Sequence, residues 1–376
     1  MTYKRGDRFR LNVSEALMTQ NNDWLAFLSQ QNAQIENNSV TGFDDTVNEL
    51  RAAEQDDILC ELGHLGFISA SGEEAESFLQ NQLSNDIKNV SDSHSQLNAY
   101  CTAKGRALSL FRTFKHDNQY YLQLPVDRIE ATLKRLRMFV LMTKVTLEDT
   151  SDKLVAIGVA GPNAQTLLKS VVNNTPTQDN QCVSDGDLLA CKIPGKVIRY
   201  MIVANTNRAI DAWKTLSPNC KPCAHTAWSY LDIHAGLPQV YDANSEAFVP
   251  QMLNLHNLDG ISFQKGCYPG QEVVARMHFL GKLKRRMYLA HVDSDNPPAA
   301  GDFIFAEGDE TKEGVGKVVD SQASPEGGFD LLTVLQIASA EKGPLFLNSS
   351  SGPALKLLEL PYTVTLERED KPTAKL

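Results

Sequence analysis

The pattern of apolar and polar positions predicts a chain in which short strands alternate with amphipathic helices. From Ile68 to Leu79, an apolar run ends at a glycine, and apolar side chains then recur at helical spacing. Ile157 to Leu168 repeats this order of strand, glycine turn and helix. A duplicated strand–helix unit suits two similar halves, so the predicted fold class is α+β.

Further elements follow from the same patterns. We expect an antiparallel meander where apolar runs are separated by turn residues, and helices where apolar positions recur three or four apart. The meander strands are predicted at 100–101, 107–115 and 120–124, and the helices at 126–142, 208–216, 227–235 and 272–278. The helix over 227–235 should end at Gly236, because glycine is the usual residue after a helix.

The last part of the chain has a different pattern. From Met287 onward, strand-like runs recur at short spacing, with Gly, Pro and Asp turns between them. This pattern predicts a small all-β barrel. The predicted parts are an N-terminal extension (1–57), a first α+β subdomain (58–150), a second α+β subdomain (151–285) and a C-terminal β-barrel (286–376).

The predicted extension over 1–57 is partly disordered or helical. Between Gln20 and Asn38, nine of nineteen positions are Asn or Gln, a composition that buries little apolar surface. Apolar residues at helical spacing interrupt this tract, namely Trp24, Leu25, Phe27 and Leu28. Two interpretations remain open, a short helix docked on the body or a mobile tail.

Composition narrows the functional classes. The 376 residues include 36 Lys and Arg against 46 Asp and Glu, a formal net charge of −10, which argues against a dedicated duplex nucleic-acid binder. Seven cysteines at irregular spacing suit a reducing compartment better than a disulfide framework. We read no apolar leader and no apolar run long enough to span a bilayer, so we expect a cytoplasmic protein without a membrane partner.

A cysteine between two glycines is the strongest candidate for chemistry. Cys267 lies between Gly266 and Gly270, directly ahead of a predicted helix. The helix N-terminus and the nearby Lys265 would both favour a thiolate over a thiol. The alternative interpretation is a tight turn with a small buried cysteine.

Positive charge gathers in the same stretch, against the sign of the whole chain. Between 265 and 286 the one anion is Glu272, four residues before Arg276 and placed to pair with it. The cations of this stretch are Lys265, Arg276, Lys282, Lys284, Arg285 and Arg286. They suit an anionic ligand, such as a folate glutamate tail or RNA phosphates, and the alternative interpretation is a solvated basic loop. The sequence leaves the choice between a folate tail and RNA open.

Cys220 and Cys223 form a CxxC pair with His225 close by. A zinc site would need two further ligands, and the chain has no second CxxC. A thioredoxin-type pair would have to lie at a strand-to-helix turn. We favour a structural loop with two thiols before a helix, and we predict no metal site.

Several stretches of the chain resemble the YgfZ family, which comprises folate-binding relatives of the glycine-cleavage T-protein. The most specific stretch begins Lys265-Gly-Cys-Tyr-Pro-Gly-Gln-Glu272 and continues to Arg276. Gln80 to Asp86 and Lys104 to Arg106 resemble further motifs of the family. The resemblance extends from about residue 62 to about residue 292.

The resemblance implies two ferredoxin-like subdomains around a central hole, followed by the β-barrel. It implies tetrahydrofolate or another reduced folate as ligand. It also implies support of iron–sulfur cluster assembly or repair and of tRNA thiolation, with iron–sulfur enzymes that modify tRNA as partners. The catalytic candidates are Cys267 and Lys265. The folate-binding candidates are Trp228, Asn81, Asp86, Tyr268, Gln271, Glu272 and Arg276.

Two alternatives stay open, one within enzymes and one from a different class of protein. One is a tetrahydrofolate-dependent aminomethyltransferase, and the other is a non-catalytic scaffold or binding protein. An assay with folate and an aminomethyl donor would separate the first from a thiol-dependent role. Whether Cys267→Ala has the same effect as a deletion would separate a thiol-dependent role from a scaffold. Direct binding to nucleic acid also stays open.

Overall fold

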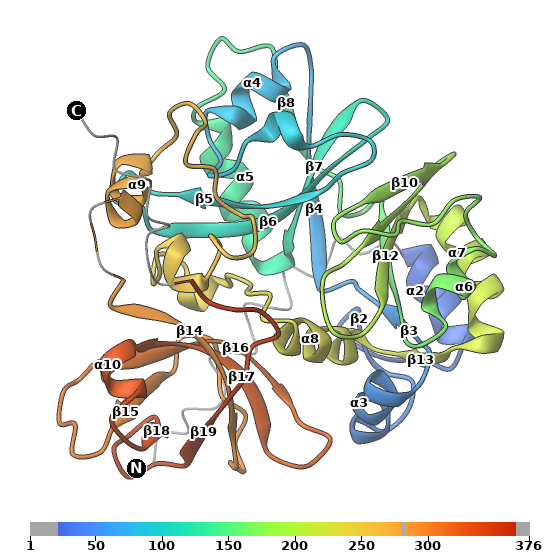
Figure 1. Cartoon of the computed structure of the whole chain (residues 1–376). Helices are drawn as coiled ribbons and strands as arrows, with labels where there is room; N and C mark the ends of the chain where they lie inside the picture. The colour runs from blue at the N-terminus through green and yellow to red at the C-terminus, as the bar shows by residue number, and fades with distance from the viewer. Residues whose placement is uncertain (1–21, 280, 282, 366–376) are drawn as a thin grey trace, which may run out of the picture. The chain divides into compact units, whose positions relative to one another are not determined.

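The computed structural model describes residues 22–279, 281 and 283–365 of the chain (Figure 1). The described residues form two compact units, each built from segments that are distant in sequence. Unit 1 comprises 22–76, 89–96 and 112–232, and unit 2 comprises 77–88, 97–111 and the described residues from 233 onward. None of the helices in the described ranges has the length and apolar character needed to cross a membrane.

One sheet of unit 1 has the strand order β10-β11-β12-β9-β3-β13. Its strands are β3 (Ile58–Glu61), β9 (Val155–Ala160), β10 (Cys182–Asp185), β11 (Leu188–Lys192), β12 (Arg199–Ala204) and β13 (Lys221–Cys223). The neighbours pair antiparallel except β13, which runs parallel to β3. β9 and β12 are buried along their whole length, which explains why their sequences are continuous apolar runs.

Helices α6 (Ala164–Leu168) and α7 (Thr206–Leu216) contribute apolar side chains to the core of this sheet. α7 begins where the side chain of Asn205 accepts a hydrogen bond from the backbone N–H of Arg208. Its Trp213 is fully buried.

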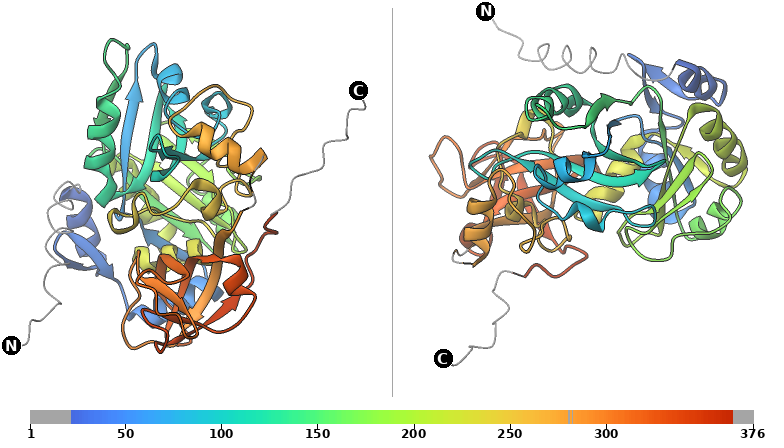
Figure 2. Two further views of the ribbon diagram at one scale, coloured as in Figure 1. Left: turned by 90° about the vertical axis from the view of Figure 1, so that its left-hand side faces the viewer. Right: turned by 90° about the horizontal axis from the view of Figure 1, so that it is seen from above.

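The N-terminal helix α2 (Asn22–Gln30) docks in the same core (Figure 2). Trp24 meets Trp213 edge-on, with the ring centroids 5.6 Å apart. Between α2 and β3 lie a hairpin of β1 (Gln34–Glu36) and β2 (Ser39–Gly42) and the helix α3 (Thr46–Gln55). Of the two interpretations left open for the Trp24 segment, the structure shows the docked helix.

A second sheet has the order β5-β6-β7-β4-β8. Its strands are β4 (Leu65–Ser71), β5 (Gln96–Cys101), β6 (Ala107–His116), β7 (Gln119–Pro125) and β8 (Thr146–Asp149), and β6 passes from unit 2 into unit 1 at Arg112. β5, β6 and β7 are the predicted meander. The glycine of each predicted strand–helix echo has a positive φ, 113° at Gly72 before α4 (Ala75–Gln80) and 134° at Gly161 before α6.

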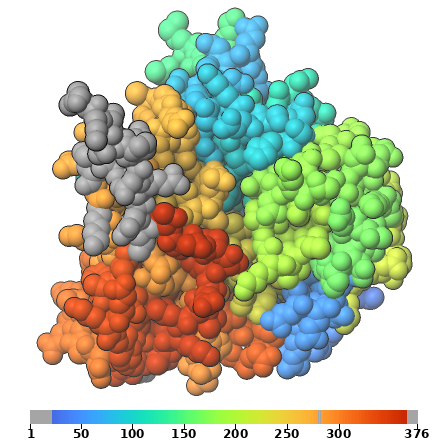
Figure 3. Space-filling view, viewed as in Figure 1, coloured from blue at the N-terminus to red at the C-terminus, as the bar shows by residue number. Residues whose placement is uncertain are grey.

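The predicted helix over 126–142 is shorter than the apolar pattern suggested. A turn of 3₁₀ helix (Val126–Arg128) leads into α5 (Ile129–Arg137), and the following apolar residues form an exposed loop. Leu141 is 87% exposed with φ 39°, and Met142 is 98% exposed. The loop protrudes at the upper edge of unit 1 (Figure 3). The apolar run Met138–Met142 was therefore wrongly predicted as helix, because it has no core to face.

Unit 2 contains a closed barrel with the strand order β14-β17-β16-β15-β18-β19, as the sequence predicted in outline (Figure 1). The strands are β14 (Arg285–Val292), β15 (Phe303–Ala306), β16 (Gly316–Ala323), β17 (Phe329–Gln336), β18 (Leu345–Leu347) and β19 (Ala354–Leu358), and α10 (Ile337–Ala340) follows β17. The short β18 was not predicted. Unit 2 has one core inside the barrel and a second core that joins residues of 97–111 to β14, β16 and β17.

One cysteine pairing corrects the sequence analysis. Cys182 and Cys191 face each other across the ladder of β10 and β11 and are joined by a disulfide. The irregular spacing of the cysteines did not indicate this bond, because only the antiparallel register brings the two residues opposite each other. The other five cysteines are free.

Candidate functional site

The cysteine-containing loop of unit 2 leads directly into α9 (Gln271–Phe279). Gly270 ends the loop with φ 82°, and a side chain there would overlap the carbonyl oxygen of Thr102 and the backbone of Gly105. Glycine is therefore required at 270 for two reasons, the backbone conformation and the close approach of 102–105. The Lys104–Arg106 motif and the cysteine loop are neighbours for this reason.

Cys267 presents an exposed thiol on this loop. Gly266 beside it has open space around its backbone. Burial raises the pKa of the Cys101 thiol to about 12, and that of Cys60 well above its usual value. Burial, with Asp57 and Cys223, also raises the pKa of Cys220 to about 12. Among the described free cysteines, Cys267 is the one that is exposed.

Lys265 is buried and anchors the loop. Its ammonium Nζ donates to the carbonyl oxygens of Gln80, Leu83 and Asn85, at distances between 2.5 and 2.8 Å. It also lies 5.2 Å from the ring centroid of Tyr268. Burial lowers the pKa of Lys265 to about 8, and Asp86 acts in the opposite direction. The Lys265 ammonium thus holds the segment 80–85 by hydrogen bonds. Its predicted catalytic role stays a prediction.

The structure brings most of the predicted folate residues together in unit 2. Asp86 accepts from Gln80 Nε2 at 3.0 Å, and Gln271 Nε2 donates to the Lys265 carbonyl at 3.3 Å. Burial raises the pKa of Tyr268, whereas Asn81 is exposed. The exposed Glu272 and Arg276 do not form the predicted ion pair among the ion pairs of the described chain.

Gln82 is a residue that the sequence analysis did not single out. It lies within the segment that Lys265 anchors, and it is buried. Its side-chain oxygen has no hydrogen-bond partner among the described residues. A buried amide oxygen without a partner is costly, so a ligand N–H that reaches it would be favoured. The Gln80–Asp86 motif contained the residue, but nothing in the sequence indicated its orphaned oxygen.

Trp228 belongs to unit 1, on α8 (His225–His234), and only 3% of it is exposed. The Arg199 guanidinium lies 4.9 Å from its ring centroid, and Gly158 of β9 packs directly against the ring. Asp232, four residues further on the helix, pairs with Arg199 at 2.8 Å. Arg199 and Asp232 were missed by the sequence analysis, although the spacing of Trp228 and Asp232 places both on one helix face. The stacking of Trp228 on a pterin stays a prediction.

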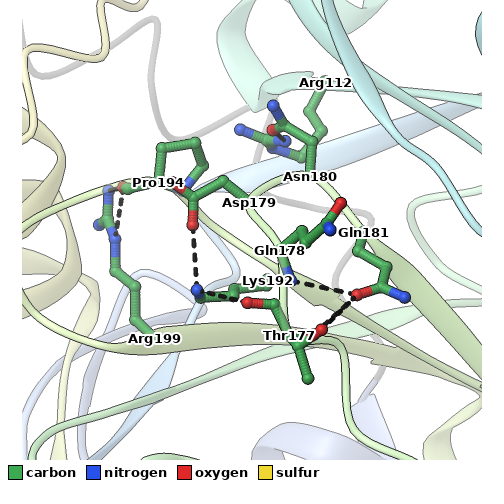
Figure 4. A network of polar contacts seen from close by, with 9 residues as sticks. All are labelled: Arg112, Thr177, Gln178, Asp179, Asn180, Gln181, Lys192, Pro194 and Arg199. Carbon is green, nitrogen blue, oxygen red and sulfur yellow. Dashed lines mark hydrogen bonds and ion pairs between the residues drawn. The ribbon is translucent and has the colours of Figure 1, made fainter.

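Arg112 and Lys192 hold the polar loop 177–181 of unit 1, and Lys192 contacts both Thr177 and Asp179 (Figure 4). Arg112 donates to the Asn180 side-chain oxygen at 2.7 Å, and Arg199 donates to the Pro194 carbonyl at 2.9 Å. Burial lowers the pKa of Arg112 to about 10. These contacts lie within unit 1 and give the network a structural role.

The CxxC pair lies at β13 and shows no metal geometry. Cys223 stands opposite Cys60 in the parallel pairing of β13 and β3. No group of His, Cys, Asp and Glu suited to a metal ion occurs within the described ranges.

Comparison with known proteins shows which proteins this chain resembles in sequence and fold. Residues 10–199 match the GCVT N-terminal domain. The tRNA-modifying protein YgfZ of Colwellia psychrerythraea is 31% identical over 312 residues, which cover 82% of this chain and 94% of that protein. The protein of the same name from Klebsiella pneumoniae is 31% identical over 296 residues, covering 78% and 89%. The crystal structure of glycine cleavage system aminomethyltransferase T from Bartonella henselae matches with a TM-score of 0.63 at 16% identity, covering 84% of this chain and 88% of that one.

The domain match and the structural likeness define the class, a mixed α/β protein with a GCVT N-terminal domain and a closed β-barrel. Within this class, the chain belongs to the YgfZ family, since relatives of that name match it over most of both chains. The fold class and the family that the sequence suggested are confirmed. The likeness to aminomethyltransferase T, at 16% identity, shows the fold alone.

Proposed function

We propose that this chain binds a reduced folate and supports tRNA modification by iron–sulfur enzymes, with Cys267 as its reacting thiol. The observation that supports the proposal best is the placement of Cys267, exposed on a loop that Lys265 and Gly270 fix at both ends. A fixed loop holds a nucleophile or an iron ligand in one orientation without further ordering. The family relatives carry the name of tRNA-modifying proteins, which suggests the cellular process.

The residues around the loop fit a folate. The unpartnered Gln82 oxygen is a hydrogen-bond acceptor for an amide or amino N–H of a pterin ring. Asn81 and Gln271 would add further amide groups, and the Asp86 carboxylate would accept an N–H. Arg276 would attract the glutamate tail. A bound reduced folate would supply a one-carbon carrier.

The test distinguishes the role of the Cys267 thiol from the binding of folate. Cys267→Ser removes one exposed sulfur, so it should leave the fold and folate affinity unchanged and lower the amount of modified nucleosides in tRNA. Mass spectrometry of nucleosides from a deletion strain carrying the variant gives the first readout, and calorimetry with tetrahydrofolate gives the second. Cys220→Ser is the matched control and should restore modification. Full modification with Cys267→Ser would overturn the role of the thiol, and a purified protein without folate affinity would overturn the ligand.

A further inference from the structure

Unit 1 carries an exposed apolar loop that the proposed function does not use. We call residues 138–142 the apolar loop, and its exposed members are Met138 (58%), Phe139 (43%), Leu141 (87%) and Met142 (98%). Every other large apolar side chain of the described residues is at most 41% exposed. A contiguous apolar patch of this kind is typical of a surface that another molecule covers.

The backbone of the apolar loop is held at both ends. At its start, the Arg137 guanidinium donates to the carbonyl oxygen of Leu147 at 2.7 Å. At its end, the backbone N–H of Lys144 donates to the Glu74 carboxylate at 2.7 Å. Between these points, the N–H groups of positions 138, 139, 140 and 143 donate to carbonyl oxygens of the same segment. A loop that is already ordered loses little conformational entropy when it docks.

Leu141 has a backbone conformation that leucine rarely adopts. Its φ of 39° lies in the left-handed region, which glycine and asparagine tolerate best. Among the described non-glycine residues with positive φ, Leu141 is the one with an apolar side chain. This conformation costs free energy, and yet it leaves a large apolar group almost wholly in water. Folding gains little from such a side chain, so its benefit has to come from contact with another molecule.

The charged residues beside the apolar loop carry both signs. Lys134 is exposed and lies one helical turn before Met138, on the same side of α5. At the other end of the loop, Lys144 pairs with the Glu73 carboxylate at 2.7 Å and contacts Glu74 through its backbone. An apolar centre with a polar rim is the usual make-up of a protein–protein interface, and Met and aromatic side chains are enriched in such centres.

We propose that the apolar loop docks in an apolar pocket of a protein partner, whose rim carries a carboxylate opposite Lys134 and a cation opposite Glu74. An anionic membrane or a nucleic acid would attract Lys134 but repel Glu73 and Glu74. A second copy of this chain would need a matching apolar pocket, and the pocket beside α7 is lined by polar and charged side chains alone. The apolar loop belongs to unit 1 and Cys267 to unit 2, so the proposal does not depend on the role of the thiol.

The test first identifies the partner and then measures its affinity for the full chain. Met142 is replaced by the photoreactive amino acid p-benzoylphenylalanine, the cells are irradiated, and the crosslinked protein is identified by mass spectrometry and purified. Calorimetry with this purified protein should show that Leu141→Asn and Met142→Gln each weaken binding at least about tenfold, as is typical of residues at the centre of an interface. Asparagine tolerates the positive φ at 141, so Leu141→Asn should keep the thermal midpoint of the unaltered chain.

Two control variants accompany this measurement. Ile198→Asn alters an exposed apolar residue of unit 1 outside the apolar loop and should leave the affinity within about twofold. Cys267→Ser should bind the partner normally, so a failure of the thiol proposal is seen separately in tRNA modification. Crosslinking to a second copy of the chain or to lipid, or no protein adduct beyond that formed with the same probe at Ile198, would overturn the proposal. Equal affinity of Leu141→Asn and the unaltered chain would also overturn it.

Discussion

At the scale of single residues, the cysteines differ most in burial. Iodoacetamide reacts with thiolate, so a thiol whose pKa is raised by burial reacts slowly near neutral pH. We expect Cys267 to be alkylated first and Cys220 much later, with Cys60 and Cys101 protected until the protein unfolds. Peptide mapping after short exposures measures the order. Labelling of Cys220 ahead of Cys267 would contradict the placement of the thiol.

A second residue-scale prediction concerns a carboxylate shared by two histidines in unit 2. Asp330 accepts from His291 at 2.7 Å and contacts His234 at 2.9 Å, and His291 also contacts Asp293. Burial opposes the charged form, but the hydrogen bonds to Asp330 and Asp293 raise the pKa of His291 above its usual 6.5.

A raised pKa means that the folded state binds the proton of His291 more tightly than the unfolded state does. The stabilisation is fully present below pH 6.5 and is lost as the pH rises through the folded-state value. We therefore expect this part of the thermal stability to decrease from pH 6 to pH 8, and His291→Gln to flatten the profile. Calorimetry across this range measures it, with the exposed His94→Gln as control. A profile that His291→Gln leaves unchanged would rule out this linkage.

The sequence indicated the cysteine loop but not how it is held. Gly266, Cys267 and Gly270 were identified from the local pattern of glycines, since turn chemistry is local. The three carbonyl partners of Lys265 were out of reach of that reasoning, because they lie about 180 residues earlier in the chain. The orphaned oxygen of Gln82 was also out of reach, because the burial of this side chain depends on the fold of unit 2. Long-range contacts of this kind leave no mark in a local pattern.

At the scale of elements, the docking of α2 is the feature with the largest expected effect on stability. Trp24 is 3% exposed and packs on Trp213 and Phe27. Trp24→Ala should lower the free energy of unfolding by about 3 to 5 kcal/mol, the usual range for a buried large aromatic. Chemical denaturation followed by circular dichroism measures the loss. Trp24→Phe is the matched control and should cost much less, and a loss below about 1 kcal/mol for the alanine variant would show that α2 is not docked.

The success of sequence reasoning also varied between elements. The echo of strand, glycine and helix was predicted because positive φ at Gly72 and Gly161 is a local requirement. The end of α5 at Arg137 was missed because apolar residues at helical spacing look alike whether or not a core faces them. β18 was missed because three residues give too short a pattern.

At the scale of the whole molecule, the discontinuous make-up of unit 2 has a direct consequence. Its second core combines Ala99, Cys101, Ala107 and Leu110 with Leu253 and other residues after 233. A fragment that starts at residue 233 would lack part of this core, so we expect it to have little fixed tertiary structure when expressed alone. Near-UV circular dichroism and proton NMR dispersion would show this. A cooperatively folded fragment would contradict the division into units.

The units differ in kind from the four parts expected from the sequence, and that division into parts stays a prediction. The expected boundaries treated each part as a continuous stretch, and the end of the second subdomain near 285 falls at the start of β14. The units instead exchange segments at 77, 89, 97, 112 and 233. Apolar periodicity indicates that a segment is buried, but it does not say which core the segment joins.

The anchoring of Lys265 bears on how the chain is made. The segment Gln80–Asn85 leaves the ribosome long before its lysine partner, which follows 185 residues after Gln80. At typical synthesis rates of about 5 to 20 residues per second, this segment waits roughly 10 to 40 seconds with its carbonyl groups and neighbouring apolar side chains unpaired. During that interval the nascent chain exposes an unfinished core, which is the kind of surface that chaperones protect. The cysteine loop can be completed only after Gly270 has been made, so a translation product truncated before Lys265 would not carry the thiol site.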